Sequence, residues 1–397
     1  MSDLRTSFGS QPRTQRQCKV QSAECKVKND IHCLWPVTLH FALCTRHFAL
    51  CLVLTGFWTF VLLSTPAAAQ PPNARIGEAV PRDVREMYDR GLQYLATTQT
   101  ATGDWTDGGQ QGPGVTGLGL MVFLASGEDP NFGLYSNHVR RAARNIITSQ
   151  NASTGYLGNS MYHHGFGMLG LAEAYGAVDD RQLWPESREK KDQRSIGVAL
   201  ELAVRTAITS QKKNSTGAWR YSPDATDADT SVSGAILVGL LAARNAGIEV
   251  PDESIDKAIS YYTKMTATSG QVAYAGGLGG FDESLARISI ASLVYSIARR
   301  KDLPQHKATL GYLVNKLEFA GPSGFGWMEY QRYYQAQALF QGDVEAWEKW
   351  NKLLIRQLKA AQQPDGSFKG SHGTATATSM SLLALALNYR FLPIYER

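Results

Sequence analysis

The chain after residue 69, which we call the body (residues 70–397), contains no cysteine. All five cysteines of the 397-residue sequence precede it, at Cys18, Cys25, Cys33, Cys44 and Cys51. Their absence excludes disulfide bonds, thiolate nucleophiles and cysteine metal ligands from the body. A thioester of the complement type needs a cysteine and is excluded for the same reason.

The body also lacks an excess of basic residues. Residues 1–69 hold seven Lys and Arg against three acidic residues, so they carry +4 of the formal net charge of +5 and leave the body at +1. No basic cluster interrupts this near-neutral composition. Because nucleic-acid-binding proteins show a basic patch or stripe, we expect no nucleic-acid partner.

Strand-like patterns are scarce as well, and two kinds of helical segment alternate instead. One kind is amphipathic, such as residues 83–99, where Leu92, Leu95 and Gln99 share a face at helical spacing. The other kind is apolar or small on nearly every side, such as residues 115–126. A helix that is apolar all round is buried all round. The body is therefore predicted to be all-α.

The one long apolar run lies near the start of the chain, at residues 48–64. Ala67 and Ala69 follow it in the small-residue pattern of a signal-peptidase site. We therefore expect residues 1–69 to be an N-terminal extension with a signal peptide, residues 70–82 to be a linker, and the protein to be exported to a periplasm or secreted. The alternative is an uncleaved segment that anchors the protein in a membrane, which would be its only membrane contact.

A motif at the start of the folded region recurs along the body. The stretch "RGLQYLATTQTATGDW" joins a helix, a turn with glycine and an aromatic residue, and five later segments repeat that order. The aromatic residues that mark the six copies are Trp105, Tyr156, Trp219, Tyr274, Trp327 and Phe368. Each copy pairs an amphipathic helix with an apolar one. Neighbouring copies must stack, because one hairpin cannot bury its apolar helix alone.

Six such pairs predict an α/α toroid over residues 83–397. Six apolar helices would form an inner ring, and six amphipathic helices an outer ring. An open solenoid is the alternative, but it leaves apolar helices exposed at both ends unless polar repeats cap them. The sequence shows no polar cap, so a closed ring is favoured.

The first copy resembles the QW repeat of the squalene–hopene cyclase and protein prenyltransferase superfamily. The positions that carry the resemblance are Arg90, Gly91, Tyr94, Leu95, Gln99, Gly103 and Trp105. The other copies are degenerate, and those that end at Tyr274 and Trp327 lack the Gln. The resemblance covers residues 83–397 and implies the toroid fold. It also implies that the Gln and the aromatic residue tie neighbouring hairpins together, which is a structural role.

Functional side chains are expected where the inner helices begin, because a rigid scaffold there holds the preceding loops. The candidate ligand-binding residues are His163, His164, Asp282, Glu283, Tyr330, Tyr333 and His372. Nearby aromatic residues such as Tyr162 and Phe166 suit a cavity wall and a core equally. With Asp227 and Asp229, the acidic candidates predict a rim that suits a neutral or cationic ligand, or a metal, and repels a diphosphate.

The segment "DADTSV" resembles the acid motif DxDDTA of squalene–hopene cyclases. In that family the middle Asp protonates the substrate alkene, and Ala228 stands at its place here. Asp227 and Asp229 are then the candidate catalytic acids. The alternative for Asp229 is to cap the helix that follows it, since Asp is a preferred N-cap residue.

We expect no cofactor and no metal site. Prenyltransferases bind Zn²⁺ through Asp, Cys and His, and the body has no cysteine. His163, Asp229 and His372 are the residues from which a cysteine-free site would have to be built, because His and carboxylate groups both bind Zn²⁺.

Two functions remain open, and whether the protein is an enzyme is left undecided. The favoured one is binding, in which an exported toroid holds an apolar small molecule or a protein partner at its central cavity, with catalysis unproven. The missing middle Asp, the absent cysteine, the single toroid where cyclases have two, and the expected export support it. The alternative is a terpenoid cyclase or prenyltransferase that acts on an isoprenoid with Asp227 or Asp229 as the acid.

Overall fold

The computed structural model describes residues 80–106, 111–184, 193–276, 283–317 and 327–395, which belong to one compact unit, 73–397. The predicted signal peptide and nearly all of the predicted linker lie outside the described residues. None of the described helices is long and apolar enough to span a bilayer.

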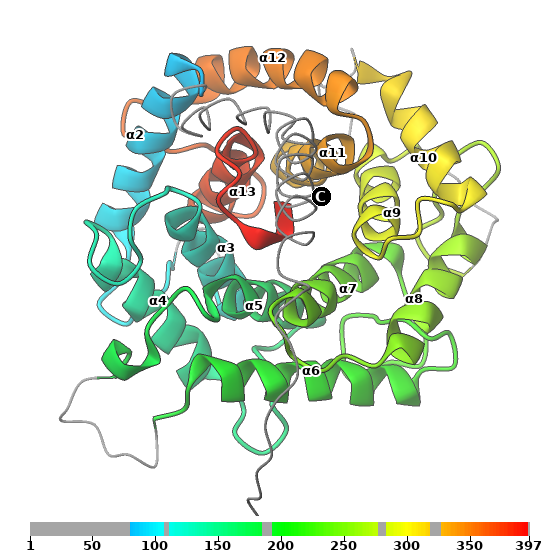
Figure 1. Ribbon diagram of the computed structural model, residues 1–397, viewed down its shortest axis with the longest axis horizontal. Helices are drawn as coiled ribbons and strands as arrows, with labels where there is room; N and C mark the ends of the chain where they lie inside the picture. Colours follow the sequence, from blue (N-terminus) through cyan, green and yellow to red (C-terminus); the bar gives the residue numbers. More distant parts are fainter. Residues whose placement is uncertain (1–79, 107–110, 185–192, 277–282, 318–326, 396–397) are drawn as a thin grey trace, which may run out of the picture. The chain divides into compact units, whose positions relative to one another are not determined.

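Twelve helices among the described residues form two concentric rings (Figure 1). The outer ring consists of α2 (Arg82–Thr98), α4 (Ser136–Ser149), α6 (Ile196–Lys213), α8 (Asp252–Met265), α10 (Pro304–Val314) and α12 (Val344–Ala361). The inner ring consists of α3 (Pro113–Leu124), α5 (Met161–Ala174), α7 (Thr230–Asn245), α9 (Leu285–Ile297), α11 (Met328–Gly342) and α13 (Thr374–Ala386). No strand occurs in these described parts of the chain, and the predicted all-α toroid is confirmed.

Side-chain polarity decides which helices lie inside. Every residue of α3 is buried, and in α13 only Thr374 is not. By contrast, α2 buries one face, which includes Val84, Tyr88 and Leu95, and turns its charged residues outward. Removal of apolar surface from water is the main force that places the two kinds of helix.

The ring closes between its first and last outer helices. At the end of α12, Gln362 Nε2 donates to the Met87 carbonyl oxygen of α2 at 2.8 Å, and Lys359 Nζ lies 2.8 Å from Asp83 Oδ1. In the inner ring, α13 packs against α3. These contacts exclude the open solenoid.

Four glutamines at outer-helix ends repeat one arrangement of hydrogen bonds. The Gln99 amide donates to the Gly103 carbonyl oxygen in its own turn at 3.0 Å and to that of His138 on the next outer helix at 3.1 Å. The same pair of bonds joins Gln150 to Gly155 and Ala199, Gln211 to Gly217 and Ser254, and Gln362 to Gly366 and Met87. Each amide therefore ties two neighbouring repeats together.

Replacement of Gln211 by leucine should lower the free energy of unfolding by about 2 kcal/mol, because two buried carbonyl groups lose their donor. Gln211 is 3% exposed, and both of its bonds are 2.8 Å long. Urea unfolding followed by circular dichroism measures the change. The control is Gln93→Leu on the exposed face of α2, which should change stability by less than about 0.5 kcal/mol. Equal effects of the two substitutions would contradict the bridging role.

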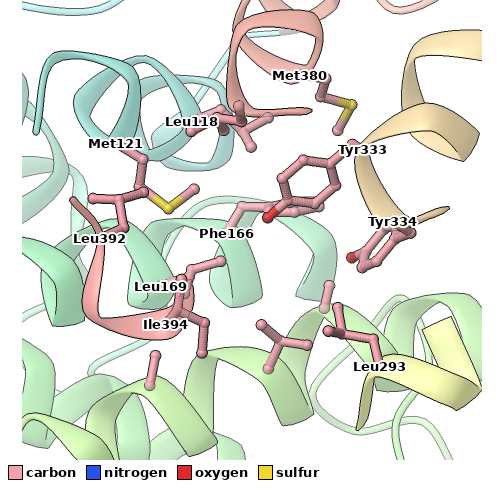
Figure 2. Close-up of a cluster of buried hydrophobic side chains, with 14 of the residues drawn as sticks. Leu118, Met121, Phe166, Leu169, Leu293, Tyr333, Tyr334, Met380, Leu392 and Ile394 are labelled. Atoms are coloured by element: carbon pink, nitrogen blue, oxygen red, sulfur yellow. The ribbon is translucent and has the colours of Figure 1, made fainter. Parts of the chain in front are cut away.

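The C-terminal segment fills one end of the inner ring. Leu392, Ile394 and Tyr395 are buried, and Figure 2 shows the first two in the same cluster as inner-ring side chains. Gln341 Nε2 at the end of α11 donates to the Ile394 carbonyl oxygen at 3.4 Å, and the Tyr395 hydroxyl donates to that of Leu383 at 3.2 Å. The centre of the ring is thus occupied at the C-terminal ends of the inner helices.

Candidate functional site

A cavity of about 450 Å³ lies at the other end of the ring, where four inner helices begin. Its wall comes from the first two turns of α3, α5, α11 and α13, from the loops before them, and from Tyr221 in the loop before α7. Hollows of about 400 and 560 Å³ also occur elsewhere, one on the outer face of α6 and one at the C-terminal ends of the inner helices. The cavity at the helix starts is the one that holds candidate residues from the sequence, and its volume suits a small molecule.

The cavity is apolar at depth and polar at its mouth. Its deeper wall includes Leu118, Phe166 and Met380, which are buried one turn or more inside their helices. Its outer wall includes Gln111 and Asn159 with the two histidines described below. Two large exposed aromatic residues, Trp327 and Tyr221, also line it and are 53% and 45% exposed.

His163 lies on the cavity wall in the first turn of α5. Its Nδ1 accepts a hydrogen bond from the Gly114 amide at 3.2 Å, and burial lowers the pKa of His163, which favours the neutral imidazole. A Cβ atom at Gly114 would lie 2.9 Å from that nitrogen, so only glycine leaves room for the ring. Because Nδ1 accepts, the ring proton is on Nε2.

His372 lies on the same wall and is paired with a buried carboxylate. His372 Nδ1 is 3.1 Å from Glu329 Oε1, and the Ser371 amide donates to the same oxygen at 3.0 Å. Burial acts to raise the pKa of Glu329, but the hydrogen bond from His372 and those from backbone amides outweigh it, and the pKa lies below its ordinary value. The ionised Glu329 therefore holds a proton on Nδ1 of His372.

Of the two tyrosine candidates, one lines the cavity and the other lies in the core. Tyr330 is on the cavity wall and is 7% exposed. Tyr333 is 2% exposed and packs edge-on against Phe166, with ring centroids 6.2 Å apart, and against Tyr334 (Figure 2). The two tyrosines are three residues apart, so Tyr333 lies nearly one turn further along α11, and only Tyr330 lines the cavity.

Two further candidates, His164 and Glu283, do not line the cavity. His164 is fully buried; its Nδ1 accepts from the Leu157 amide and its Nε2 contacts the Ala203 carbonyl oxygen, each at 3.0 Å, so no ring nitrogen is left for a ligand. Burial lowers its pKa to about 4. Glu283 pairs instead with Lys316 Nζ at 2.6 Å near the surface. Asp282 lies outside the described residues.

Asp229 is the N-cap of α7. Its Oδ1 accepts from the amides of Ser231 and Val232 at 2.9 and 2.8 Å, and the residue is fully buried. Burial raises its pKa to about 6, against the effect of those hydrogen bonds and of Arg220, whose Nε is 3.6 Å from Oδ2. Asp229 does not line the cavity, so the capping alternative matches its position.

Asp227 is 66% exposed at its side chain and pairs with Arg220. None of the described residues that line the cavity is acidic. The acidic rim expected from the sequence is therefore not formed there by the described residues, because Asp227, Asp229 and Glu283 each have partners elsewhere.

The three possible metal ligands do not form a cluster. Among the described residues, no group of three or more His, Cys, Asp or Glu side chains is arranged to hold a metal ion. His163 and His372 share the cavity wall, whereas Asp229 caps α7 outside it.

Several residues of the site were not among the candidates, and Glu329, Trp327 and Tyr221 are the most prominent of them. One feature of the sequence could have identified Glu329: it is an acidic residue in the first turn of an inner helix, next to Tyr330. Its partner His372 is 43 residues away in sequence, so the pair itself is visible only in three dimensions. Trp327 was assigned to the repeat framework, yet it lies on the cavity wall.

Several solved structures share the fold at low sequence identity. An inactive variant of the GH76A α-1,6-mannanase of Salegentibacter sp. HEL1_6, in complex with α-1,6-mannotetrose, is 8% identical with a TM-score of 0.57, over 78% of this chain and 99% of that chain. The type II terpene cyclase MstE from Scytonema is 14% identical with a TM-score of 0.51, over 79% and 100%. An α-amylase from Clostridium perfringens is 11% identical with a TM-score of 0.54, over 77% and 98%. These similarities show the α/α toroid fold alone.

Comparison of the amino-acid sequence gave less than comparison of the fold. A search of the curated proteins gave no match. A family model described as a domain of unknown function, DUF6288, matches residues 85–301, which is more than half of the chain. The chain therefore belongs to the DUF6288 family.

Proposed function

We propose that the protein is an exported toroid that binds a small molecule with an apolar body in the cavity at the inner-helix starts. The observation that carries the proposal is the shape of this site: an apolar wall at depth, a polar mouth, and a ring centre filled by residues 392–395 at the opposite end. Burial of an apolar ligand against Leu118, Phe166 and Met380 would supply the binding free energy. The QW-like repeats support a relationship to the squalene-cyclase and prenyltransferase superfamily.

Binding is preferred over isoprenoid chemistry because no acid among the described residues is in position for the latter. Protonation of an alkene requires a carboxylic acid in contact with the substrate, and Asp227 and Asp229 lie off the cavity wall. Glycoside hydrolysis usually requires two carboxyl groups that flank the bond, and the described wall residues provide none. The protein-partner alternative is less favoured, because the cavity has the volume of a small-molecule site.

The neutral fluorescent probe N-phenyl-1-naphthylamine should bind to the purified protein with an increase in its emission. The substitution Val115→Trp places an indole in the cavity and should weaken this binding by at least about tenfold, the equivalent of one well-buried apolar contact. Fluorescence titration measures the affinity, and circular dichroism checks the fold of the variant.

The matched control is Val198→Trp on the outer helix α6, where Val198 is 47% exposed. It adds the same indole far from the cavity and should leave probe affinity unchanged. Equal affinities of both variants, or no binding to the wild-type protein, would refute the proposed function.

A further inference from the structure

The two histidines on the cavity wall have opposite hydrogen-bonding capacities. His163 uses Nδ1 as an acceptor for the Gly114 amide, so its Nε2 carries hydrogen and donates. Gly112 also packs against this ring, with a Cβ position 3.1 Å from Nδ1, so the ring orientation is fixed on two sides. The structure thus provides one fixed N–H donor on the wall.

His372 provides the complementary group. Its Nδ1 is bound to Glu329 Oε1, which as an ionised carboxylate only accepts, so Nδ1 carries hydrogen. In the neutral imidazole Nε2 is then an acceptor. The Trp327 ring lies edge-on, with its centroid 5.5 Å from that of His372, and supports the ring from another side.

A donor and an acceptor on one wall select the chemistry of the ligand's polar end. A carboxylate only accepts, so it leaves the His372 acceptor unpaired and also lies near the negative charge of Glu329. An ammonium group is attracted by the negative charge of Glu329, but it only donates, so it leaves the His163 N–H unpaired. A hydroxyl group both donates and accepts, and it carries no charge. Both imidazoles are partly buried, and a polar group that loses water without gaining a partner reduces affinity.

We infer that the ligand is a neutral alcohol, whose hydroxyl group lies at the polar mouth between His163 and His372 and whose apolar body extends toward Leu118, Phe166 and Met380. This inference rests on the proposed binding function and adds the class of the ligand to it. It also corrects the origin of the expected preference for a neutral ligand: the preference comes from two imidazoles and Glu329, and not from a ring of rim carboxylates.

The test is displacement of N-phenyl-1-naphthylamine by decanol, decanoate and decylamine at pH 8, where histidine is ordinarily neutral. Decanol should bind about tenfold more tightly than either charged analogue, which corresponds to one unpaired buried polar group. The variants His163→Phe and His372→Phe keep a ring of similar shape and remove the donor or the acceptor. Each should reduce the preference for decanol to about twofold or less while the fluorescent probe still binds.

The matched control is His138→Phe on the outer helix α4, away from the cavity, which should keep the full preference. Equal or tighter binding of decanoate or decylamine, with probe binding intact, would overturn the inference and leave the proposed function standing. A preference that survives both cavity substitutions would overturn it as well. Absence of probe binding to the wild-type protein would instead remove the proposed function, and the inference with it.

Discussion

Alanine in place of Gly366 is expected to lower the free energy of unfolding by about 4 kcal/mol. Gly366 has φ +90°, and a Cβ atom there would lie 2.2 Å from the Arg90 carbonyl oxygen of α2. The left-handed backbone costs a non-glycine residue about 1–2 kcal/mol. Backbone atoms cannot rotate away as a side chain can, so the seam between α12 and α2 must also open, at a further cost of about 1–3 kcal/mol.

Gly247 offers a control that separates these two contributions. Its φ is +93°, nearly the same as that of Gly366, but no atom lies within 4 Å of a Cβ added there. Gly247→Ala should therefore lower the free energy of unfolding only by the cost of the left-handed backbone, about 1 kcal/mol. Guanidinium unfolding of both variants measures the difference. If Gly366→Ala and Gly247→Ala lower the free energy of unfolding equally, the packing between α12 and α2 is looser than these contacts indicate.

Stability is also expected to depend on pH through Asp229. Burial raises the pKa of this carboxyl from 3.8 to about 6, although the Ser231 and Val232 amides and Arg220 oppose the rise. The folded state thus holds the proton more tightly than the unfolded state. The contribution of Asp229 to stability is present in full below its unfolded pKa and is lost as the pH rises through about 6. A shift of about two units corresponds to roughly 3 kcal/mol.

Asp229→Asn tests this dependence, because asparagine keeps the capping oxygen and carries no charge. Between about pH 4 and pH 7, the stability of the variant relative to wild type should rise by roughly 3 kcal/mol. Asp229→Ala also removes the cap and should be about 1 kcal/mol less stable than Asp229→Asn at every pH. Urea unfolding across the pH range gives both differences, and the comparison between variants cancels the effects of other groups that are the same in all of them. If the free energies of unfolding of wild type and Asp229→Asn depend on pH in the same way, the raised pKa of Asp229 is refuted.

The fold could be predicted because the residue pattern of each helix indicates whether that helix lies in the inner or the outer ring. The run from Val115 to Leu124 is apolar on every side and is buried on every side, whereas α2 has one apolar face and lies outside. Gln99 and Gly103 were assigned a structural role, and the structure shows their hydrogen bond and the contact of the turn with α4. Local patterns of this kind repeat, so six copies give the same signal six times.

The site was less predictable because neighbouring residues in a helix point about 100° apart. His163 and His164 are adjacent, yet one lines the cavity and the other bonds to core backbone groups. Tyr330 and Tyr333 differ for another reason: Tyr333 lies nearly one turn further along α11 and is buried in the core. Sequence reasoning located the correct helix starts, but rotation about each helix axis depends on packing between helices.

Charge was the weakest of the predictions about the site. Asp227, Asp229 and Glu283 all stand near inner-helix starts in the sequence, which suggested an acidic rim. Each is neutralised or bonded by a local partner, namely Arg220, backbone amides or Lys316. The formal charge of residues that lie near a site in the sequence therefore does not give the charge of the surface that a ligand contacts.

The way the ring closes has a consequence for the order in which the molecule can fold. The partners of α2 include Gln362 and Lys359, and the centre is completed by Ile394 and Tyr395. Lys359 and Gln362 lie 276 and 275 positions after their partners in α2, so α2 cannot complete these contacts until that later part of the chain has been made. Contacts so distant in sequence make folding slow. Closure of the ring between α12 and α2 is therefore expected to be a late step in the folding of the toroid.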